Sequence, residues 1–428
     1  MMRSLYSGVS GLRVHQTKMD VIGNNIANVN TVGFKASRVT FSELFYQTTQ
    51  TASGHNDETQ VGGQNAKQIG LGASLATIAV DIAGEGGTQS TNRPFDLKIN
   101  GDTFFIVNSH GATYFTKAGN FATDDYGRLV TDTGAYVMGY TADEPGGALL
   151  TDQIRPIEIY VDKFTNTDPS ATEASHFAGN INKADGNFAE NLPLTRNVQI
   201  YDNLGYQYSV QVQIRKVSDT EYSVTTNGVY AGSSLAEGLE ASMDGTLTFD
   251  EATGRLTQDT IMDLSITGSD SFTVNPIKVD FSKITCFGTE STIDSARGTY
   301  KGEGTGKKVG VMTSVGIDAS GNVVAAYDNG DNEILGQIAV AQFSNPSGLE
   351  KVGENMYAAT LNSGEFNGLG EPIANTGGSI TSGVLEMSNV DLAGEFTDMI
   401  VTQRGFQANS RIITTSDTMI EELLNLKR

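Results

Sequence analysis

Apolar residues near the start of the chain recur with the period of an amphipathic helix. They lie on one face of a helix over residues 4–28. Gln16 and Gly23 interrupt this face, so the apolar seam is narrow and the helix needs a partner to be stable in water. The positions expected to form the contact face are Leu5, Val9, Leu12, Met19, Ile22 and Ile26.

The other end of the chain mirrors this pattern. Apolar positions fit a heptad across residues 390–426. Ser388 and Asp391 form a Ser-x-x-Asp capping box, which predicts the start of a helix. Polar residues interrupt this heptad too, and one of them is included in the expected contact face, which comprises Leu392, Phe396, Met399, Gln403, Phe406, Ile413, Ile420 and Leu424.

Between the two helical ends the chain alternates apolar and polar residues in short runs that are typical of β-strands. Every second residue from Tyr206 to Ile214 is apolar, which predicts a half-exposed strand. Asn100 and Gly101 form the dipeptide that favours a type I′ hairpin. The 49 glycines favour many tight turns. We therefore predict a mainly β protein with long terminal α-helices that form a coiled-coil-like core.

The stretch "GNNIANVNTVGF" ends the first helix. Asparagine and glycine tolerate left-handed backbone conformations, and asparagine side chains can satisfy the backbone groups that a helix end leaves open. We expect the chain to leave the helix here and to enter an extended linker. The residues expected at this exit are Gly23, Asn24, Asn25, Asn28, Asn30, Gly33 and Phe34.

Shifts in composition suggest a nested order of domains. The polar stretch from residue 48 to 67 lacks periodicity, and a second shift follows residue 143. Two β domains are expected, one inserted in the other. The predicted segments are a helical domain at 1–30 and 386–428, a linker at 31–67, a discontinuous β domain at 68–145 and 286–385, and an inserted β domain at 146–285.

The charge balance narrows the classes of partner. The chain of 428 residues has a formal net charge of −22, and it contains no Lys/Arg run that could form a basic patch. We therefore expect no nucleic acid and no anionic lipid surface among its partners. Apolar runs fall short of the roughly 18 residues of a membrane span. The start of the chain lacks the apolar block of a cleaved signal peptide, so we expect no Sec export.

Catalytic motifs are not recognisable in the sequence. "GEGTGKK", residues 302–308, has the wrong spacing for a phosphate-binding loop. The four histidines, His15, His55, His110 and His176, are scattered, which makes a metal centre of several histidines improbable. We expect no catalytic residue, metal or cofactor. A secreted β-rich adhesin or enzyme that uses the helices only to oligomerise is a remote alternative.

Cys286 is the one cysteine of the chain, so no internal disulfide can form. Its neighbours Ile284 and Phe287 favour a small buried hydrophobic residue. The alternative is a reactive thiol with a lysine partner, either Lys283 or a lysine of another chain.

Four segments resemble the bacterial flagellar rod and hook axial proteins. They are "SLYSGVSGL" at residues 4–12, "MDVIGNNIANVNTVGFKASRVTF" at 19–41, "YFTKAGNFATDDYGRLVTDTGAYVMGY" at 114–140, and the C-terminal stretch from residue 388 to 428. The asparagine-rich block and the "QRGFQAN" block are specific to that family and differ from generic coiled-coil sequence. Hook-type members of the family carry an inserted region of the length seen at 146–285, whereas the shorter distal rod proteins lack it.

The resemblance implies a structural role without enzymatic activity. It implies that the chain polymerises into an open helical tube, the flagellar hook, with the terminal helices forming the inner tube and residues 31–67 bridging subunits. A distal rod-type axial protein is the alternative. The implied partners are the distal rod protein, the hook cap protein, the hook-filament junction protein and the flagellar export apparatus. Some members crosslink subunits through lysinoalanine, for which Cys286 is the candidate here.

Overall fold

The computed structural model describes residues 2–54, 62–236, 238–257, 260–268 and 276–426. Two compact units make up the chain. The first contains both terminal helices and one β domain, and the second is a β-sandwich. The first unit comprises Met1–Val161, Val315–Val324 and Ile334–Arg428, and the second comprises Asp162–Ser314 and Ala325–Glu333.

These units move the expected boundaries of the inserted domain from 146 and 285 to 162 and 314. Residues 146–161 stay with the first unit because β12 (Arg155–Pro156) pairs with β11 (Tyr136–Thr141) and because Ile157 and Ile159 are fully buried. Residues 286–314 join the second unit because β23 (Asp294–Arg297) pairs with a strand of the sandwich. Both boundaries of the inserted domain are set by strand pairing between segments that are distant in sequence. The composition of the chain does not reveal such pairing.

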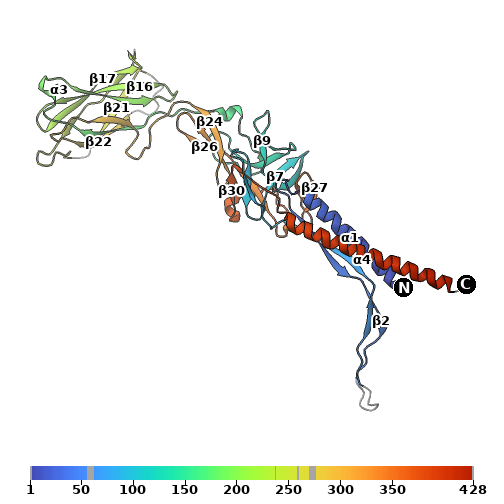
Figure 1. Cartoon of the computed structure of the whole chain (residues 1–428). Coiled ribbons are helices and arrows are strands. Elements are labelled where there is room, and N and C mark those ends of the chain that lie inside the picture. The colour runs from blue at the N-terminus through green and yellow to red at the C-terminus, as the bar shows by residue number, and fades with distance from the viewer. Residues whose placement is uncertain (1, 55–61, 237, 258–259, 269–275, 427–428) are drawn as a thin grey trace. The chain divides into compact units, whose positions relative to one another are not determined.

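Both terminal helices are present as predicted, and they lie side by side (Figure 1). Helix α1 spans Met2–Ala27 and helix α4 spans Leu392–Asn425. They run antiparallel, since Lys18 pairs with Asp398 whereas Asn409 lies beside Gly11. The capping prediction needs a correction: Asp391 itself is the N-cap, and its carboxylate accepts a hydrogen bond from the amide of Ala393 at 3.0 Å.

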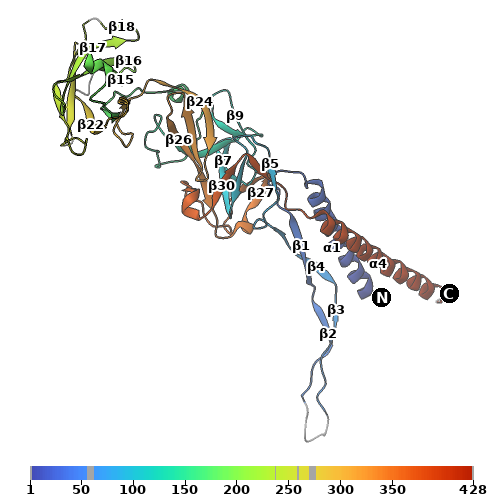
Figure 2. The same cartoon turned by 60° about the vertical axis from the view of Figure 1, so that its left-hand side comes forward.

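After α1 the chain forms a long antiparallel ribbon, which Figure 2 shows beside the helices. β1 (Ser37–Glu43) pairs with β4 (Ala73–Val80), and β2 (Tyr46–Gln50) pairs with β3 (Lys67–Gly70). The expected linker is therefore half of a ribbon whose backbone groups pair with one another. Residues 68–80 belong to this ribbon rather than to the β domain, and residues 55–61, with His55, lie outside the described residues.

The β domain of the first unit is built on one sheet, in the strand order β13 (Asn166–Thr167), β24 (Gly310–Ile317), β25 (Asn322–Tyr327), β26, β11, β7, β8, β28, β27. Phe104, Ile106, Phe115 and Phe343 form part of its buried core. The bounds of the sheet strands are β7 Thr103–Ser109, β8 Ala112–Thr116, β11 Tyr136–Thr141, β26 Asn332–Gln342, β27 Glu350–Gly353 and β28 Met356–Ala358. The smaller elements are β5 Thr88–Ser90, β6 Leu97–Asn100, β9 Phe121–Thr123, β10 Leu129–Thr131, β29 Glu371–Pro372, β30 Ser379–Ser382, β31 Val384–Glu386 and the 3₁₀ helices Pro346–Gly348 and Ile373–Thr376.

The hairpin expected at Asn100-Gly101 is wrong. Strand β6, which ends at Asn100, pairs with β30. Strand β7, which follows Gly101, pairs with β8 and β11 instead. The dipeptide therefore turns the chain from one sheet into another. The competing partner β30 lies almost three hundred residues away, so the local turn signal could not reveal it.

The second unit is a β-sandwich of two sheets. One sheet has the order β19, β21, β22, β14, β23, and the other has the order β15, β16, β17, β18, with β20 beside β17. The prediction of a half-exposed strand is confirmed, since β16 buries Val210, Val212 and Ile214 between exposed or half-exposed residues. The bounds of the sandwich elements are β14 Ala174–Asn180, α3 Gly186–Ala189, β15 Leu194–Tyr201, β16 Gln207–Lys216, β17 Glu221–Ala231, β18 Ser234–Leu235, β19 Glu240–Ser242, β20 Gly245–Thr248, β21 Ile261–Thr267 and β22 Ile277–Thr285. The short elements α2 Asp162–Thr165 and β13 Asn166–Thr167 precede them, and β13 pairs with β24 outside the two sandwich sheets.

The predicted fold class, mainly β with long terminal helices and two β domains, is confirmed. None of the helices in the described part of the chain is long and apolar enough to cross a membrane.

Candidate assembly site

Helix α1 packs against both α4 and the ribbon. Its Lys18 ammonium lies 3.4 Å from the Asp398 carboxylate of α4. Its His15 ring lies beside Gly405 of α4 and also meets the Phe41 ring of β1 edge to face, with 6.2 Å between the ring centres. The termini of the chain and the first ribbon strand thus form three packed layers. These layers are the structural basis of the candidate site.

Small and polar residues form the seam between α1 and α4. A Cβ atom added at Gly11 would lie 2.7 Å from the Asn409 side chain, and one added at Gly405 would lie 2.7 Å from the His15 ring. The side chains of Thr402 and Ser416 are buried in this part of α4. Glycine lets the two backbones approach closely. The helices therefore pack tightly without using most of the large apolar residues of α4.

The expected contact residues of α1 face this layered core. Ile22 is buried, with 3% of its surface exposed. The other five are half-buried, and they are Leu5, Val9, Leu12, Met19 and Ile26.

The expected contact residues of α4 divide into two groups. Met399, Phe406, Ile413 and Ile420 are half-buried. The others remain exposed within the chain, and they are Leu392, Phe396, Gln403 and Leu424. Further large apolar residues of α4, which the heptad did not single out, are also exposed: Ile400, Val401, Ile412, Met419 and Leu423. A large apolar surface of α4 is therefore left open by the fold of one chain.

The exit from α1 is more helical than its composition suggests. Gly23 and Asn24 lie inside the helix on its exposed side, and Asn30 is exposed in the turn that follows. The Asn28 side chain donates to the carbonyl of Asn24 at 2.9 Å and so satisfies part of the helix end. Gly33 has a φ of +67°, and a Cβ atom there would lie 2.8 Å from the amide nitrogen of Ala118. Glycine is thus required at this point on two grounds.

Asn25 joins the three layers. Its side-chain amide donates to the carbonyl of Ser37 and to the carboxylate of Glu395, both at 2.9 Å. Its side-chain oxygen accepts from the amide of Ser37 at 3.0 Å. The residue is almost fully buried. One asparagine therefore connects α1 to the start of the ribbon and to the first turn of α4.

A buried ion pair joins the two ends of the chain, and sequence reasoning missed it. The ammonium of Lys35 lies 2.8 Å from the carboxylate of Glu386, and the two side chains are only 1% and 2% exposed. The ammonium also donates to the carbonyl of Gly84, and the carboxylate accepts from the amide of Gly86. Lys35 follows α1 and Glu386 ends the strand before α4. We call this Lys35–Glu386 pair the clasp.

Further side chains hold the backbone on either side of Lys35. Lys351 donates to the carbonyl of Lys35 at 2.9 Å, and its ammonium lies 4.6 Å from the centre of the buried Phe34 ring. Asn355 donates to the carbonyl of Val32 at 3.0 Å. Asn389 accepts from the amide of Ala36 at 2.7 Å. The segment from Val32 to Ala36 is consequently fixed to the β domain and to the entry of α4.

Lys117 is a further buried cation close to the clasp. Burial, followed by the charge of Lys35, lowers its pKa from 10.5 to about 8. The carboxylates of Glu386, Asp102 and Glu85 oppose this effect. Its ammonium donates to the carbonyl of Gly101 at 2.6 Å. The ammonium groups of Lys35 and Lys117 together therefore carry more positive charge than the single carboxylate of Glu386 can balance.

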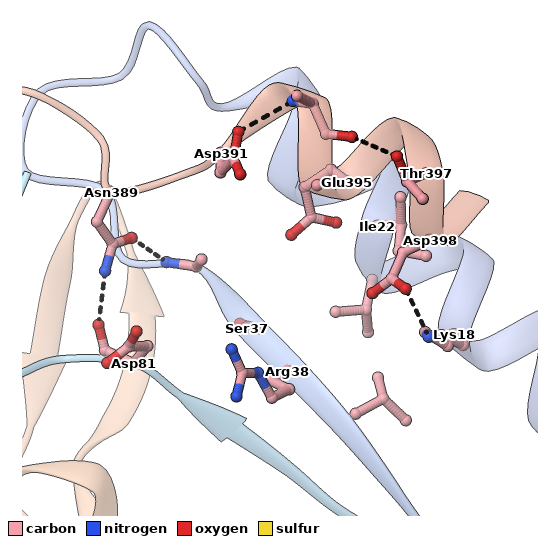
Figure 3. Close-up of a pocket in the computed structure, with 15 residues that line it drawn as sticks. Lys18, Ile22, Ser37, Arg38, Asp81, Asn389, Asp391, Glu395, Thr397 and Asp398 are labelled. Atoms are coloured by element: carbon pink, nitrogen blue, oxygen red, sulfur yellow. Dashed lines mark hydrogen bonds and ion pairs between the residues drawn. The ribbon is translucent and has the colours of Figure 1, made fainter. Parts of the chain in front are cut away.

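A groove of about 750 Å³ opens between α1, the first turns of α4 and β1 (Figure 3). Val21, Ile22 and Val39 contribute apolar surface to it. Figure 3 shows the Arg38 guanidinium apart from the Lys18–Asp398 pair. Arg38 makes no ion pair among the described residues.

Cys286 lies far from these helices in sequence, in the β-sandwich. Its thiol is half-buried, 3.6 Å from the hydroxyl of Tyr222. Burial and this hydrogen bond raise the pKa of Tyr222. Lys183 lines the same pocket of about 260 Å³, whereas the expected intrachain lysine, Lys283, lies over the ring of Tyr300. A crosslink at Cys286 stays a prediction.

The histidines have structural surroundings where the structure describes them. His15 packs in the helix seam, and burial followed by the charge of Lys18 lowers its pKa. His176 bonds to the carbonyl of Gly298 at 2.8 Å. Among the described residues, no three His, Cys, Asp or Glu side chains lie close enough to hold a metal ion.

Four family models match the chain. Residues 5–35 match "Flagella basal body rod protein", and residues 98–172 match "Flagellar hook protein FlgE/F/G D1 domain". Residues 156–298 match "Flagellar basal body protein FlaE D2 domain", and residues 381–426 match "Flagellar basal body rod FlgEFG protein C-terminal".

Curated relatives match over the full length. The flagellar hook protein FlgE of Treponema pallidum is 36% identical, with 100% of both chains covered. The FlgE of Salmonella typhimurium is 31% identical, with 99% of this chain and 100% of that protein covered, and the basal-body rod protein FlgG of Bacillus subtilis is 32% identical over 100% of both. The solved structure of Helicobacter pylori FlgE2 is 14% identical with a TM-score of 0.45, covering 68% of this chain and 98% of that one. The resemblance predicted from the terminal motifs is thus confirmed, and the chain belongs to the FlgE/F/G family of flagellar hook and basal body rod proteins.

Proposed function

We propose that this protein is a structural subunit that polymerises into the flagellar hook, a flexible tube that transmits torque from rod to filament. One observation carries the proposal: α4 leaves large apolar side chains exposed along its length although it already packs against α1. Phe396 and Val401 are 51% and 60% exposed. Such a surface marks an interaction site, and copies of the same chain supply a matching one.

The clasp supports the same proposal. Torque passes through the tube only if the helices are fixed to the β domains that surround them. The Lys35–Glu386 pair joins the segment after α1 to the end of β31, just before α4. Asn25 and Asn389 join α1 and the entry of α4 to the start of the ribbon by directional hydrogen bonds. The chain needs no ligand for this role. We expect no catalytic step in its function.

The expected partners follow from the position of a hook subunit in the flagellum. The subunit contacts copies of itself through interfaces that differ on the two partners, which leaves a helical assembly open at its ends. The distal rod protein lies below it, the hook cap protein lies above it during growth, and the hook-filament junction protein follows. It reaches the hook through the flagellar export apparatus. A distal rod-type subunit is the second candidate, since a rod protein FlgG matches the chain over its full length.

Electron microscopy of the purified protein in polymerising salt tests the proposal. The full chain is compared with a chain that lacks residues 1–30 and 390–428. We expect curved, flexible tubes from the full chain and monomers from the truncated chain. Circular dichroism of the truncated chain must still show β structure, which separates lost assembly from lost folding. Straight, stiff tubes would favour the rod candidate. A full chain that stays monomeric at high concentration would contradict both.

A further inference from the structure

The groove between α1, the first turns of α4 and β1 carries an excess of negative charge. Its lining contains more carboxylates than cations, with Asp81, Asp391, Glu395 and Asp398 against Lys18 and Arg38. The Lys18–Asp398 pair balances one charge of each sign. Hydrogen bonds from neutral donors leave the other three carboxylates charged, and Arg38 is the one cation that remains against them. A partner that fits the groove therefore brings positive charge.

The middle of α4 has the opposite composition. Residues 399–416 include Arg404 and Arg411 but no Asp or Glu, although the whole chain has a net charge of −22. Both arginines are exposed, and neither makes an ion pair among the described residues. Because residues three or four apart are neighbours on a helix surface, the two arginines belong to one continuous stripe. We call this stripe the outer face of α4, and it comprises Phe396, Ile400, Arg404, Ala408 and Arg411.

The outer face points away from α1. Helix α1 contacts α4 through seam positions that include Asn409, which lies beside Gly11. Asn409 follows Ile400 by nine residues, or about two and a half turns, so the two side chains lie on opposite sides of α4. Phe396 and Ile400 are 51% and 59% exposed. The outer face is thus free to contact a second copy while α4 keeps its contact with α1.

The spacing of the charges on α4 defines a register between two copies. Asp391 and Asp398 are seven residues apart, and so are Arg404 and Arg411. Each arginine follows one of these acids by thirteen residues. Subunits of a helical tube all point the same way along its axis. A copy displaced along α4 by thirteen residues, roughly 20 Å, therefore brings both arginines next to both acids at once.

Helix α1 offers a second basic surface that fits less well. Arg3 and Arg13 are exposed on it, but they are ten residues apart and so cannot match the spacing of seven between the acids. Tyr6 is the one exposed large apolar residue in the described part of α1. The outer face of α4 combines the matching spacing with two large apolar side chains, so we favour it over α1.

We propose that the outer face of α4 from a second copy of this chain occupies the groove, with Arg404 beside Asp391 and Arg411 beside Asp398. Ala408 lies between the two arginines and is small, so the helix can approach Val21 closely. The inference rests on the proposed function and specifies one contact within that polymer. The two copies contribute different surfaces, and each keeps one surface open for the next copy, so the contact builds an open assembly.

Engineered cysteines test the register directly. Ala393→Cys, at the groove, and Ala408→Cys, on the outer face, are introduced together into a chain that carries Cys286→Ser. The two positions lie fifteen residues apart on one helix, which places them roughly 22 Å from each other. A disulfide needs Cα atoms within about 7 Å. Any bond between the two cysteines must therefore join two chains.

We expect oxidised tubes of this double variant to give a ladder of multimers on a non-reducing gel, whereas each single variant should give dimers at most. Ala393→Cys with Met419→Cys is the matched control. Met419 is exposed, and it lies three turns beyond Ala408 on the same face, roughly 16 Å further along α4. This control should give no ladder.

The outcomes separate the docking from the proposed function. Tubes without a ladder in the Ala408→Cys variant, or an equal ladder in the Met419→Cys control, would overturn the docking and leave the proposed function standing. A natural chain that forms no tubes would overturn both.

Charge reversal gives a second test that needs no oxidation. Arg404→Glu with Arg411→Glu should raise the protein concentration needed for polymerisation by at least about tenfold, since it places like charges together. Replacement of both by Gln should raise it less, by about threefold. Arg13→Glu on α1 is the control, and it should change the concentration by less than about twofold. Circular dichroism of each monomer checks that the fold is kept. Unchanged assembly of the Glu variant, or an equal loss in Arg13→Glu, would contradict the proposed contact.

Discussion

In the β-sandwich of the second unit, the apolar residues of the strands are buried in one core. In the α1–α4 pair, glycine and polar residues share the contact with half-buried apolar residues, and other large apolar residues of α4 face outward. Phe177 and Phe281 stack with 4.8 Å between ring centres inside the sandwich. Ile400 and Val401 of α4 are exposed. The sandwich thus buries its apolar residues within its own chain, whereas α4 leaves apolar residues exposed that the proposed assembly would cover.

Truncation of a sandwich core residue should have the largest effect on folding. Phe281→Ala removes a fully buried ring, which costs about 3–5 kcal/mol of unfolding free energy. Hydrogen exchange with mass spectrometry on peptides of β22 measures it. The matched control is Ile261→Ala on the neighbouring strand β21, where the side chain is exposed. If both variants lose the same stability, the sandwich is not held by its core.

Substitutions in the clasp test whether apolar packing can replace a buried ion pair. Lys35→Met leaves the Glu386 carboxylate buried without its partner, which should cost about 3–5 kcal/mol. Adding Glu386→Leu should recover most of this loss, because two apolar residues replace the pair. Urea unfolding of the single and double variants checks it. Lys308→Met, which breaks the exposed pair with Asp328, should change little. A double variant as unstable as the single one would refute the account.

Lys117 should make the first unit more stable as the pH rises. Its pKa falls from 10.5 to about 8 on folding, so between these values the unfolded chain binds more protons than the folded one. The penalty is fully present below pH 8 and disappears towards pH 10.5. Lys117→Met removes a penalty of ~3 kcal/mol and a hydrogen bond of ~1 kcal/mol, a net gain of about 2 kcal/mol at pH 7.

Urea unfolding of Lys117→Met and of the natural chain at pH 7 and pH 10 measures this difference. The gain should shrink at pH 10. An exposed lysine, Lys301, supplies the control variant Lys301→Met. A gain that stays constant with pH would show that Lys117 keeps an ordinary pKa.

Substitution on the open face of α4 should have the smallest effect on the single chain. Ile400→Ser with Val401→Ser should change the unfolding free energy by less than about 0.5 kcal/mol per site, because both side chains are exposed. The same variant should raise the critical concentration for polymerisation at least about tenfold. Circular dichroism and sedimentation measure the two quantities. The polar control Gln407→Ser, also on α4, should leave both unchanged. Normal assembly of the apolar variant would remove the contrast with the sandwich.

Local patterns predicted the elements that local forces decide. The heptad of α4 and the alternation in β16 are visible in sequence because one face of each element is set by the spacing of its residues. The hairpin at Asn100-Gly101 was wrong because β6 finds its partner in β30. The sandwich boundaries were misplaced for the same reason. Pairing between distant strands leaves no mark in a short window.

Sequence reasoning reached part of the structural environment of the candidate site. The asparagine-rich exit identified Asn25 and Gly33, and both have defined structural roles. Lys35 and Glu386 escaped notice, although each is a single charge among apolar or small neighbours in "GFKAS" and "GVLEMSN". A single charge among apolar or small neighbours indicates a buried charged residue, but it does not indicate which residue pairs with it. Only the fold shows that these two residues meet.

The clasp can form only late in the synthesis of the chain. Glu386 is made 351 residues after Lys35, and at 5–20 residues per second a ribosome needs roughly 20–70 s to bridge that interval. During all of it the N-terminal segment has been synthesised but its ionic partner does not exist. The first helix can therefore contact the start of the ribbon early, through Asn25 and Ser37. Its fastening to the C-terminal segment has to wait until nine-tenths of the chain has been translated.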